Sequence, residues 1–264
     1  MQIKGAHVLV TGAGRGIGLT LATRFAEAGA DVTLVARSAD ELARAAEKIG
    51  GRAHPTDLTD RVRMANFVAD IESVSRPIDI LVNNAADECV GRFDQMTADT
   101  LRFIIDLNVW AGAELTRQVL PRMIQRRSGH IVSVSSYAGV VIPPSLATYA
   151  ATKAFVTHHT ANLRAELRGS GIGFTTVELG EVADTGLMTK GRTDPELSAL
   201  FDTLYKIRLS RLITPDEIAD HTLRAVEKNR PHVRLPRRLA GAAALPDFAR
   251  AATAAIARRT RASS

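Results

Sequence analysis

The sequence has few of the features that mark secreted, membrane-spanning or multidomain proteins. Cys89 is the only cysteine among 264 residues, so no disulfide bond can form within the chain. No uncharged apolar run reaches the roughly 18 residues that a membrane-spanning helix needs. No targeting sequence precedes the first strand-like run, which begins at residue 6. These absences predict a cytoplasmic location, where a reducing environment suits a chain without disulfides.

The sequence also contains no long polar linker, low-complexity block or internal repeat. One folded domain is therefore expected, and 264 residues are enough to bury a substantial core. Within it we distinguish residues 1–236, which carry the motifs described below, from an Ala- and Arg-rich extension over residues 237–264.

Positive charge is concentrated near the C-terminus. The formal net charge is +6, but residues 228–264 alone contribute +8, from Lys228 and eight arginines against Asp247. A solvent-exposed surface is the simplest interpretation of such a segment. Nucleic acid, an anionic membrane surface and an acidic partner are the alternatives. Because no nucleic-acid recognition motif accompanies the charge, a nucleic-acid partner is not expected, and contact with a membrane surface stays open.

A glycine-rich segment follows the first strand-like run. Residues 6–10 are mostly apolar, residues 11–18 read Thr-Gly-Ala-Gly-Arg-Gly-Ile-Gly, and residues 19–28 have a helical pattern. Strand, glycine loop and helix in this order place backbone amides where they favour the negative charge of a pyrophosphate. The spacing departs from Gly-x-Gly-x-x-Gly, because Ile17 stands where the third glycine would fall. An ordinary tight turn is the alternative interpretation.

The second strand, expected over residues 31–36, ends at Arg37 and Ser38. A dinucleotide site selects between a ribose hydroxyl and a ribose phosphate at this point. An acidic residue would select NAD, whereas the Arg37 guanidinium matches a 2′-phosphate with paired donors, and Arg15 in the glycine loop can approach the same phosphate. NADP is therefore the predicted cofactor and NAD the less favoured one, unless both arginines are ordinary surface charges.

Three further segments complete the expected dinucleotide site and its surroundings. Asp57 and Leu58 follow the strand at residues 51–55 and are placed to read the adenine amino group, although Asp57 can equally cap a turn. Asn83, Asn84, Ala85 and Ala86 follow the strand at residues 78–82 and suggest a loop that bonds across the sheet ends. Helices are expected over residues 40–49, 60–74 and 98–127.

A hydroxyl, a phenol and an ammonium are brought together by residues 136–153. Tyr149 and Lys153 are four residues apart in an alanine-rich helical pattern, so their side chains share one face. A tyrosine pKa of about 10 is too high for efficient proton exchange near neutrality, and a nearby cation lowers it. Ser136 ends a strand and can donate to a carbonyl oxygen. We expect alcohol and ketone chemistry.

These motifs, in this order and spacing, resemble the short-chain dehydrogenase/reductase family of compact type. The resemblance covers residues 5–236 and rests on residues 11–18, Asp57, the Asn83-Asn84-Ala85 segment, Asn108, and Ser136 thirteen residues before a Tyr149-Ala-Ala-Thr-Lys153 run. It implies that Tyr149 is the general acid/base, Ser136 polarises the substrate oxygen, Lys153 lowers the Tyr149 pKa and binds the nicotinamide ribose, and Asn108 completes a water relay. An asparagine that merely bonds to nearby backbone is the plainer interpretation of Asn108.

The resemblance also implies an α/β fold: a Rossmann-like, doubly wound, seven-stranded parallel sheet with helices on both faces. It implies a homodimer or homotetramer built on the long helices around Asn108 and Tyr149. The expected cofactor-binding residues are Gly12, Gly14, Arg15, Gly16, Ile17, Gly18, Arg37, Ser38, Asp57, Leu58, Asn84, Ala85, Ala86, Tyr149, Lys153, Gly180, Val182 and Thr185.

Two positions depart from the family pattern. Ala86 replaces the glycine of an Asn-Asn-Ala-Gly segment and adds a methyl group beside the expected cofactor path. Leu179-Gly180 replaces a Pro-Gly pair after the sixth strand, and Thr185 is displaced by one residue. We expect Ala86 to be tolerated, whereas the second departure puts the nicotinamide contacts in question.

The expected substrate pocket involves residues 87–94, 140–147 and 186–209, because ligands of such sheets bind beyond the carboxyl ends of the strands. Its apolar residues favour a hydrophobic ketone or secondary alcohol over a polar sugar; they are Val140, Val141, Ile142, Pro143, Leu146, Leu187 and Met188. Cys89 is expected to be an inert thiol. His158 and His159 lack a third ligand in register, so no metal site is predicted.

The C-terminal extension contains a helical stripe of mostly alanine, with Phe248 and Ile256 among its members. Three roles are left open for it: a cap over the pocket, a subunit contact, or a helix lying on an anionic membrane. The function predicted for the whole chain is an NADP(H)-dependent oxidoreductase that interconverts a secondary alcohol and a ketone. A non-catalytic NADP(H)-binding sensor is the alternative.

Overall fold

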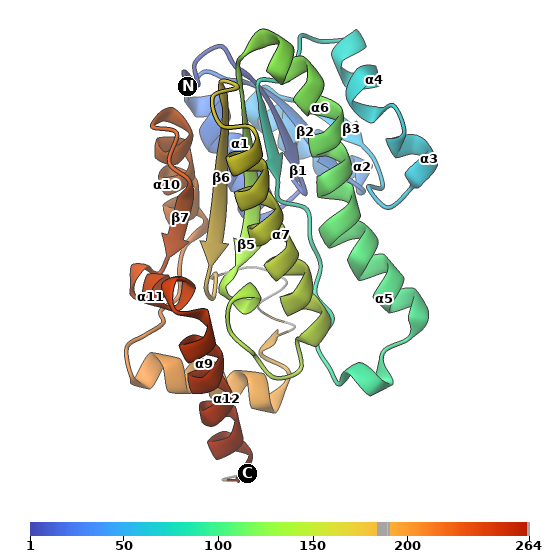
Figure 1. Cartoon of the computed structure of the whole chain (residues 1–264). Helices are drawn as coiled ribbons and strands as arrows, with labels where there is room; N and C mark the ends of the chain where they lie inside the picture. Colours follow the sequence, from blue (N-terminus) through green and yellow to red (C-terminus); the bar gives the residue numbers. More distant parts are fainter. Residues whose placement is uncertain (184–188, 190, 263–264) are drawn as a thin grey trace.

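A parallel sheet of seven strands forms the centre of the protein. The computed structural model describes residues 1–183, 189 and 191–262, with side chains as far as Ile256. Within this part of the chain the strand order is β3-β2-β1-β4-β5-β6-β7 (Figure 1). The strands are β1 (His7–Thr11), β2 (Asp31–Ala36), β3 (Arg52–Pro55), β4 (Ile80–Asn83), β5 (Gly129–Ser136), β6 (Ile172–Leu179) and β7 (His232–Leu235). The predicted Rossmann-like fold is confirmed.

The strand order reverses between β1 and β4. From β1 the chain builds outward through β2 to β3, then returns to place β4 against the other side of β1. The loops after β1 and β4 therefore leave the sheet in opposite directions, and a crevice opens between them at the carboxyl ends of the strands. Ligands of open parallel sheets bind in such a crevice.

Helices cover both faces of the sheet, and each connects consecutive strands or follows them. The helices are α1 (Gly16–Glu27), α2 (Ala39–Ile49), α3 (Arg61–Met64), α4 (Phe67–Ser73), α5 (Ala98–Ile105), α6 (Gly112–Arg126), α7 (Ala147–Glu166), α9 (Pro195–Lys206), α10 (Pro215–Glu227), α11 (Ala240–Ala244) and α12 (Pro246–Ala262). Short 3₁₀ turns lie at η1 (Phe93–Gln95), η3 (Tyr137–Gly139) and η4 (Arg237–Leu239), and η2 (Asp106–Ala111) is π-helical. None of the helices in the described ranges is long and apolar enough to cross a membrane.

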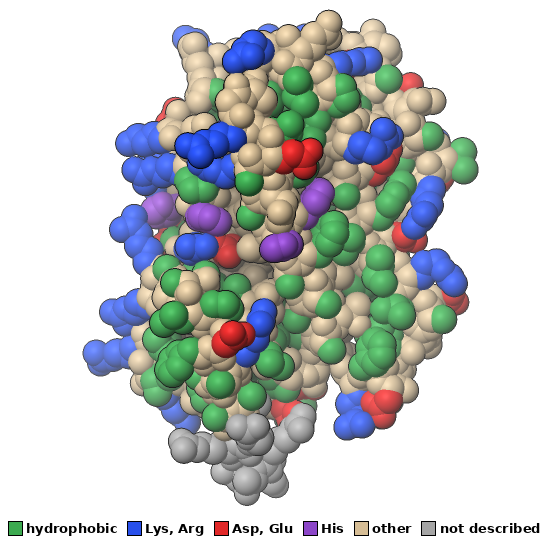
Figure 2. Space-filling view, viewed as in Figure 1, with side chains coloured by type: hydrophobic (Ala, Val, Ile, Leu, Met, Phe, Trp, Pro, Cys, Tyr) green, Lys and Arg blue, Asp and Glu red, His purple; other side chains and the backbone are tan. Residues whose placement is uncertain are grey.

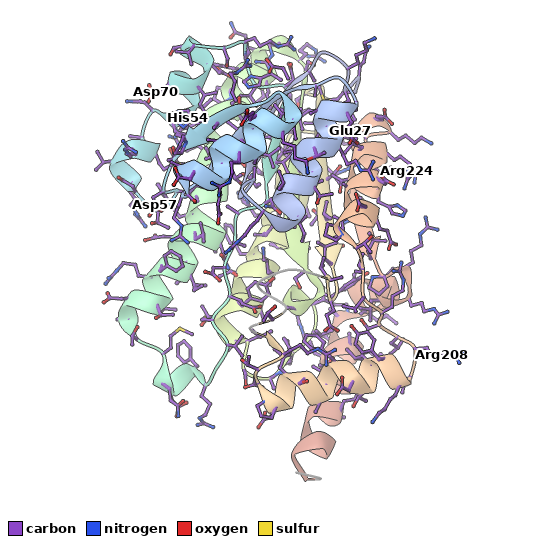
Figure 3. The ribbon with its side chains drawn as sticks, turned by 180° about the vertical axis from the view of Figure 1, so that it is seen from behind. Glu27, His54, Asp57, Asp70, Arg208 and Arg224 are labelled. Atoms are coloured by element: carbon purple, nitrogen blue, oxygen red, sulfur yellow. The ribbon has the colours of Figure 1, made fainter. Side chains whose placement is uncertain are left out.

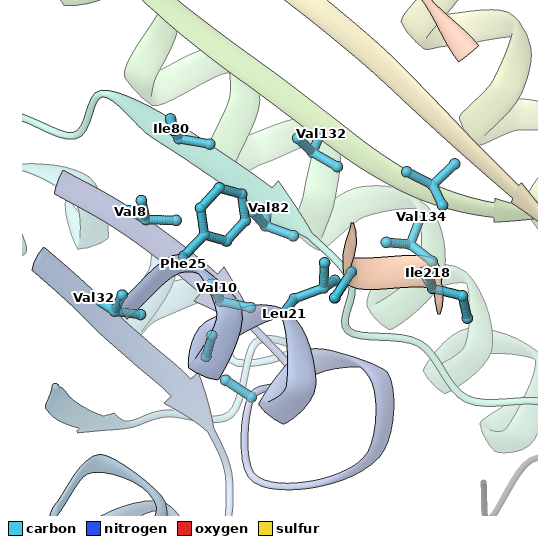
Figure 4. Close-up of a cluster of buried hydrophobic side chains, with 14 of the residues drawn as sticks. Val8, Val10, Leu21, Phe25, Val32, Ile80, Val82, Val132, Val134 and Ile218 are labelled. Atoms are coloured by element: carbon cyan, nitrogen blue, oxygen red, sulfur yellow. The ribbon is translucent and has the colours of Figure 1, made fainter. Parts of the chain in front are cut away.

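Alternate residues of each strand supply the two layers of the core. Val8 and Val10 of β1 pack with Leu21 and Phe25 of α1 on one face, as Figure 4 shows, whereas Leu9 belongs to the cluster on the opposite face. Both faces of β1 are buried, which is why it reads as a continuous apolar run and not as an alternating one. The core thus holds the strand ends rigidly beneath the crevice.

The predicted helix over residues 60–74 is wrong in one respect, because the structure divides it into α3 and α4. Gln118 of α6 inserts at the break: its Nε2 donates to Met64 O at 2.6 Å, and its Oε1 accepts from Val68 N at 3.0 Å. A continuous helix would pair that carbonyl with that amide directly. The Gln118 side chain, from a distant helix, therefore bonds to both the carbonyl and the amide, and no local sequence pattern predicts this break.

The predicted helical segment over residues 98–127 is confirmed: α5, η2 and α6 follow one another without a break, and η2, which contains Asn108, is π-helical. The start of α10 is capped by its own sequence: the Thr214 hydroxyl accepts from the Glu217 amide at 3.2 Å, and Pro215 occupies the first turn. After β7 the chain continues through η4 and α11 into α12, which packs against α9 (Figure 1).

Candidate active site

One cavity of about 970 Å³ lies at the carboxyl ends of the strands. Nearly all the residues predicted to bind the cofactor or to act in catalysis line it. They are Gly12, Gly14, Arg15, Gly16, Ile17, Gly18, Arg37, Ser38, Asp57, Leu58, Asn84, Ala85, Ala86, Ser136, Tyr149, Lys153, Gly180 and Val182. Thr185 lies outside the described residues, and Asn108 lies behind the cavity wall.

The loops after β1 and β4 are tied together by hydrogen bonds. Thr11 Oγ1 donates to Val82 O at 3.2 Å and accepts from the amides of Asn84 and Ala85, each at 3.0 Å. The Asn84 side-chain amide donates back to Thr11 O at 2.9 Å. This network has the cross-sheet bonding that the Asn-Asn-Ala sequence suggested.

The glycine loop is a tight cradle in which side chains would clash. A Cβ at Gly18 would lie 2.2 Å from Gly12 O and 2.5 Å from Asn84 Nδ2. Gly12 and Gly16 have φ angles of 65° and 56°, in the left-handed region that favours glycine. The loop therefore brings its backbone close to the start of α1, as a dinucleotide pyrophosphate requires. The residues present fit a dinucleotide.

The far end of the cavity carries the residues predicted to select the nucleotide. Ser38 Oγ accepts from Glu41 N at 3.4 Å and so caps α2, whereas Arg37 lies with its guanidinium carbon 5.7 Å from the Phe103 ring centroid. Figure 3 shows Asp57 on this side of the molecule and Arg208, beyond α9, on the other. The cavity lining includes Asp57 at the nucleotide end and Leu197, Leu200 and Phe201 of α9 at the other.

Asp57 also caps a turn, which was its alternative role in the sequence. Its Oδ1 accepts from Thr59 N at 2.9 Å and from Thr59 Oγ1 at 2.8 Å. Burial raises the pKa of Asp57, but these bonds and the charge of Arg37 outweigh burial, so the pKa is held below its usual value. The carboxylate is thus kept ionised beside Arg37.

Tyr149 and Lys153 share a buried face of α7, as their spacing predicted. The Lys153 ammonium donates to Val134 O at 3.0 Å and lies 5.6 Å from the Tyr149 ring centroid. Burial lowers the pKa of Lys153 to about 8. The ammonium is therefore mostly charged at neutral pH and loses its charge as the pH rises through about 8.

The predicted lowering of the Tyr149 pKa is wrong for this structure. Burial raises the pKa of the phenol, the negative charge of Glu88 raises it further, and only the hydrogen bond with Ser136 opposes them. The Lys153 ammonium is bonded to a strand carbonyl and is not among the groups that lower the pKa of the phenol. The phenol therefore keeps its proton at neutral pH.

Ser136 is positioned by the neighbouring strand. It ends β5 in register with Leu179 of β6, and its hydroxyl donates to Leu179 O at 3.2 Å while accepting from Ala138 N at 3.1 Å. These bonds place the hydroxyl at the edge of the sheet beside Tyr149. The juxtaposition of Ser136, Tyr149 and Lys153 agrees with the arrangement expected from the sequence.

Asn108 links the loop after β4 to α7. Its Nδ2 donates to Asp87 O at 2.8 Å and to Thr152 Oγ1 at 3.2 Å, and its Oδ1 accepts from Asp87 N at 2.9 Å. It also lines a second cavity of about 30 Å³ together with Lys153 and Asn83. That volume is large enough for one water. Asn83 Oδ1, buried there, has no hydrogen-bond partner among the described residues.

An ion pair between Arg192 and the buried Glu181 holds the segment after β6. This pair was not predicted from the sequence. Arg192 Nε donates to Glu181 Oε1 at 2.7 Å and its Nη2 to Glu181 Oε2 at 3.1 Å, while its Nη1 reaches Asp202 at 2.6 Å. The Tyr205 hydroxyl donates to the same glutamate, whose side chain is 2% exposed. The network anchors α9 next to Gly180 and Val182.

The substrate end of the cavity only partly matches the residues predicted for it. Val141, Pro143 and Leu146 line it, whereas Ile142 is 53% exposed. Val140 is buried without lining the cavity, and Leu187 and Met188 lie outside the described residues. Burial raises the pKa of the half-buried Cys89, which keeps its thiol protonated. In the described ranges no cluster of three or more His, Cys, Asp or Glu side chains has a metal-site arrangement.

Comparison with known proteins identifies the family. The short chain dehydrogenase model matches residues 6–196. The chain belongs to the short-chain dehydrogenase/reductase family. Among curated members it is 33% identical over 236 residues to the ketoacyl reductase HetN of Nostoc sp., covering 88% of this chain and 78% of HetN. Members of the family named as oxidoreductases are also similar, such as UcpA of Salmonella typhimurium, at 35% identity over 83% of this chain and 86% of UcpA.

Solved short-chain dehydrogenases have the same fold. One from Sphingobium yanoikuyae, in complex with NADPH, has a TM-score of 0.76 and 30% identity over 92% of this chain and 93% of its own. One from Streptomyces avermitilis has a TM-score of 0.80 and 26% identity over 99% of both chains. This short-chain dehydrogenase/reductase is accordingly an NAD(P)-dependent oxidoreductase acting on CH–OH and C=O groups.

Proposed function

We propose that the protein interconverts a secondary alcohol and a ketone with an apolar body, using NADP(H). One observation carries the proposal: a single cavity places the Ser136 hydroxyl, the Tyr149 phenol and the Lys153 ammonium between the glycine cradle and a largely apolar end. NADP(H) supplies or accepts the hydride when bound. The protein's own residues bind it, orient the substrate oxygen and move the proton.

NADP is favoured over NAD by the residues at the nucleotide end. Arg37 and Arg15 both line the cavity there, and a guanidinium pairs with a phosphate through two donors. Solved relatives were crystallised with NADP or NADPH. In the proposed site Ser38 binds beside the phosphate, Asp57 and Leu58 meet the adenine, and the backbone at Gly180 and Val182 meets the nicotinamide.

Tyr149 is the proposed proton donor and acceptor. In the reducing direction the carbonyl carbon takes the hydride and the carbonyl oxygen takes the phenol proton, while Ser136 donates a hydrogen bond to that oxygen. A phenol that keeps its proton at neutral pH suits this step, because it releases the proton only as negative charge develops on the oxygen. The Lys153 charge then stabilises the phenolate left behind.

Asn108 is the proposed support for proton replacement. The small cavity that it shares with Lys153 has room for one water, and Asn83 Oδ1 offers that water an acceptor. A water there would connect the ammonium to further donors and acceptors and return a proton toward Tyr149.

A homodimer or homotetramer is proposed for the assembly. Large apolar side chains are exposed on the helices around the site: Ile105 of α5 at 42%, Ile124 of α6 at 39% and Phe155 of α7 at 40%. A second copy covering these helices would bury them. Light scattering on the purified protein measures the mass, and a monomer at micromolar concentration would contradict the proposal.

The test of the proposed chemistry is oxidation of NADPH and NADH by the purified protein with aliphatic, aromatic, steroid-like and sugar ketones. The Tyr149→Phe variant is the control, and we expect its kcat to fall by about 10²- to 10⁴-fold while NADPH affinity stays the same. Full activity in that variant would reject the phenol as acid/base. Tight NADPH binding without turnover of any ketone would favour the sensor alternative.

A further inference from the structure

The C-terminal helix α12 forms one wall of the cavity. Phe248, Ala249, Ala252, Thr253 and Ile256 all line it, and their spacing of one, three, one and three residues puts them on a single helical face. Ala249 and Thr253 are 7% and 8% exposed. The Thr253 hydroxyl donates to Ala249 O at 2.7 Å within the helix, so this wall presents an almost wholly apolar surface.

That wall is continuous with the surroundings of the catalytic phenol. Ile256 packs against the buried cluster of Leu146, Tyr149, Leu197 and Leu200. At the other end of the same face Phe248 is 74% exposed, so it lies at the cavity mouth. In Figure 2 hydrophobic side chains gather over α9, α11 and α12 on this side of the molecule.

Ala252 lies midway between these two ends. Phe248 and Ile256 are eight residues apart, which corresponds to about 12 Å along a helix. The methyl side chain of Ala252 leaves the middle of the wall open, whereas a larger side chain there would occupy the space between the phenol and the mouth. Its neighbour Ala251 is exposed and does not line the cavity.

We propose that α12 sets the length of substrate that the enzyme accepts and that Ala252 is the specificity-determining residue. The substrate class is a ketone or secondary alcohol with an unbranched aliphatic chain of medium length, lying along α12 from Tyr149 toward Phe248. This inference rests on the proposed function, since it assigns the carbonyl end of that chain to Tyr149.

A matched pair of substitutions tests this proposal. Ala252→Leu narrows the cavity at the middle of the α12 wall, whereas Ala251→Leu adds a side chain that points to solvent on the same helix. The kcat/KM with NADPH is measured for 2-butanone, 2-octanone and 2-undecanone. For Ala252→Leu we expect a loss that grows with chain length and reaches at least tenfold for 2-undecanone. Ala251→Leu is expected to match the wild type. A loss in Ala252→Leu that is independent of chain length would overturn the inference.

Binding provides a second measurement that does not depend on turnover. Displacement of the fluorescent apolar probe Nile red by 2-undecanone is expected to weaken at least fivefold in Ala252→Leu and to stay unchanged in Ala251→Leu. That pattern without turnover of any ketone would support the α12 wall while rejecting the proposed chemistry. Equal displacement in both variants would contradict the proposed role of the α12 wall.

Ile256→Ala is the variant for the case in which Ala252→Leu does not fold, because it removes volume instead of adding it. This substitution enlarges the cavity near Tyr149, so the substrate preference is expected to shift toward ketones that are branched beside the carbonyl. Circular dichroism melting shows which variants are folded. Two ratios between 3-methyl-2-butanone and 2-octanone are compared with the wild type, that of kcat/KM and that of probe displacement. If both ratios are unchanged in the variant, the role of α12 is contradicted.

Discussion

The two ends of the cavity are built in different ways. At the nucleotide end, backbone groups approach closely, and hydrogen bonds between side chains and backbone join the segments at the ends of β1 and β4, as at Thr11 and Asn84. At the substrate end, apolar side chains of α9 and α12 form the walls, and one buried ion pair, Glu181 with Arg192, anchors α9 to the segment after β6.

This contrast has a functional consequence. A backbone cradle recognises what all dinucleotides share and admits little change, since an added methyl group meets other backbone atoms. A wall of apolar side chains tolerates the replacement of one apolar residue by another. We therefore expect substitutions in the cradle to impair cofactor binding, and substitutions in the apolar wall to alter the choice of substrate.

The largest expected effect is at the ion pair of the substrate end. Arg192→Ala leaves the buried Glu181 carboxylate without its guanidinium, so we expect a loss of about 3 kcal/mol in the free energy of unfolding, measured by urea denaturation. The matched control is Arg211→Ala, because Arg211 is 54% exposed and its partner Glu217 is 26% exposed, and its expected loss is at most about 1 kcal/mol.

A double variant sharpens this test. Glu181→Leu combined with Arg192→Leu removes both charges, and it should lose less than Arg192→Ala because no unpaired carboxylate remains buried. If the double variant is the less stable of the two, the contribution of Arg192 comes from its packing on Phe201 and Tyr205 and not from its charge.

The next effect is at the glycine cradle. In Gly18→Ala the new Cβ must displace the Gly12 carbonyl, so we expect a loss of about 2 kcal/mol in unfolding free energy together with weaker NADPH binding. Gly14→Ala is the control, since its Cβ would make an ordinary contact with Ala36 at 3.6 Å. Equal stability of the two variants would show that the cradle is less rigid than its geometry indicates.

The smallest effect concerns the choice between the two nucleotides. Arg37→Ala is expected to weaken NADPH binding about tenfold, because a charge-assisted pair with the 2′-phosphate is lost, and to change NADH binding little. Fluorescence titration with both nucleotides measures the ratio. Arg44→Ala, an exposed arginine of α2 that does not line the cavity, is the control. Equal weakening for NADPH and NADH would remove the 2′-phosphate assignment.

Much of the site was predictable because it is encoded in short segments. The glycine loop, Arg37 and the pair of Tyr149 and Lys153 depend on strand-to-helix turns or on one turn of one helix, and such spacing is legible in a sequence. The parallel order of β1, β4 and β5 then brings these segments to one sheet edge. Asn108 is intermediate: its position was predictable, but its bonds to Asp87 and Thr152 were not.

The sequence by itself determined the glycine cradle and the groups proposed for catalysis, because both depend on local spacing, and it determined the fold class through the family resemblance of these motifs. Only the tertiary structure decided the direction of the Tyr149 pKa, since burial and the charge of Glu88 outweigh the hydrogen bond with Ser136. Only it paired Glu181 with Arg192, and only it brought residues of the C-terminal helix to the cavity lining. Each of these depends on contacts between residues that no local pattern relates.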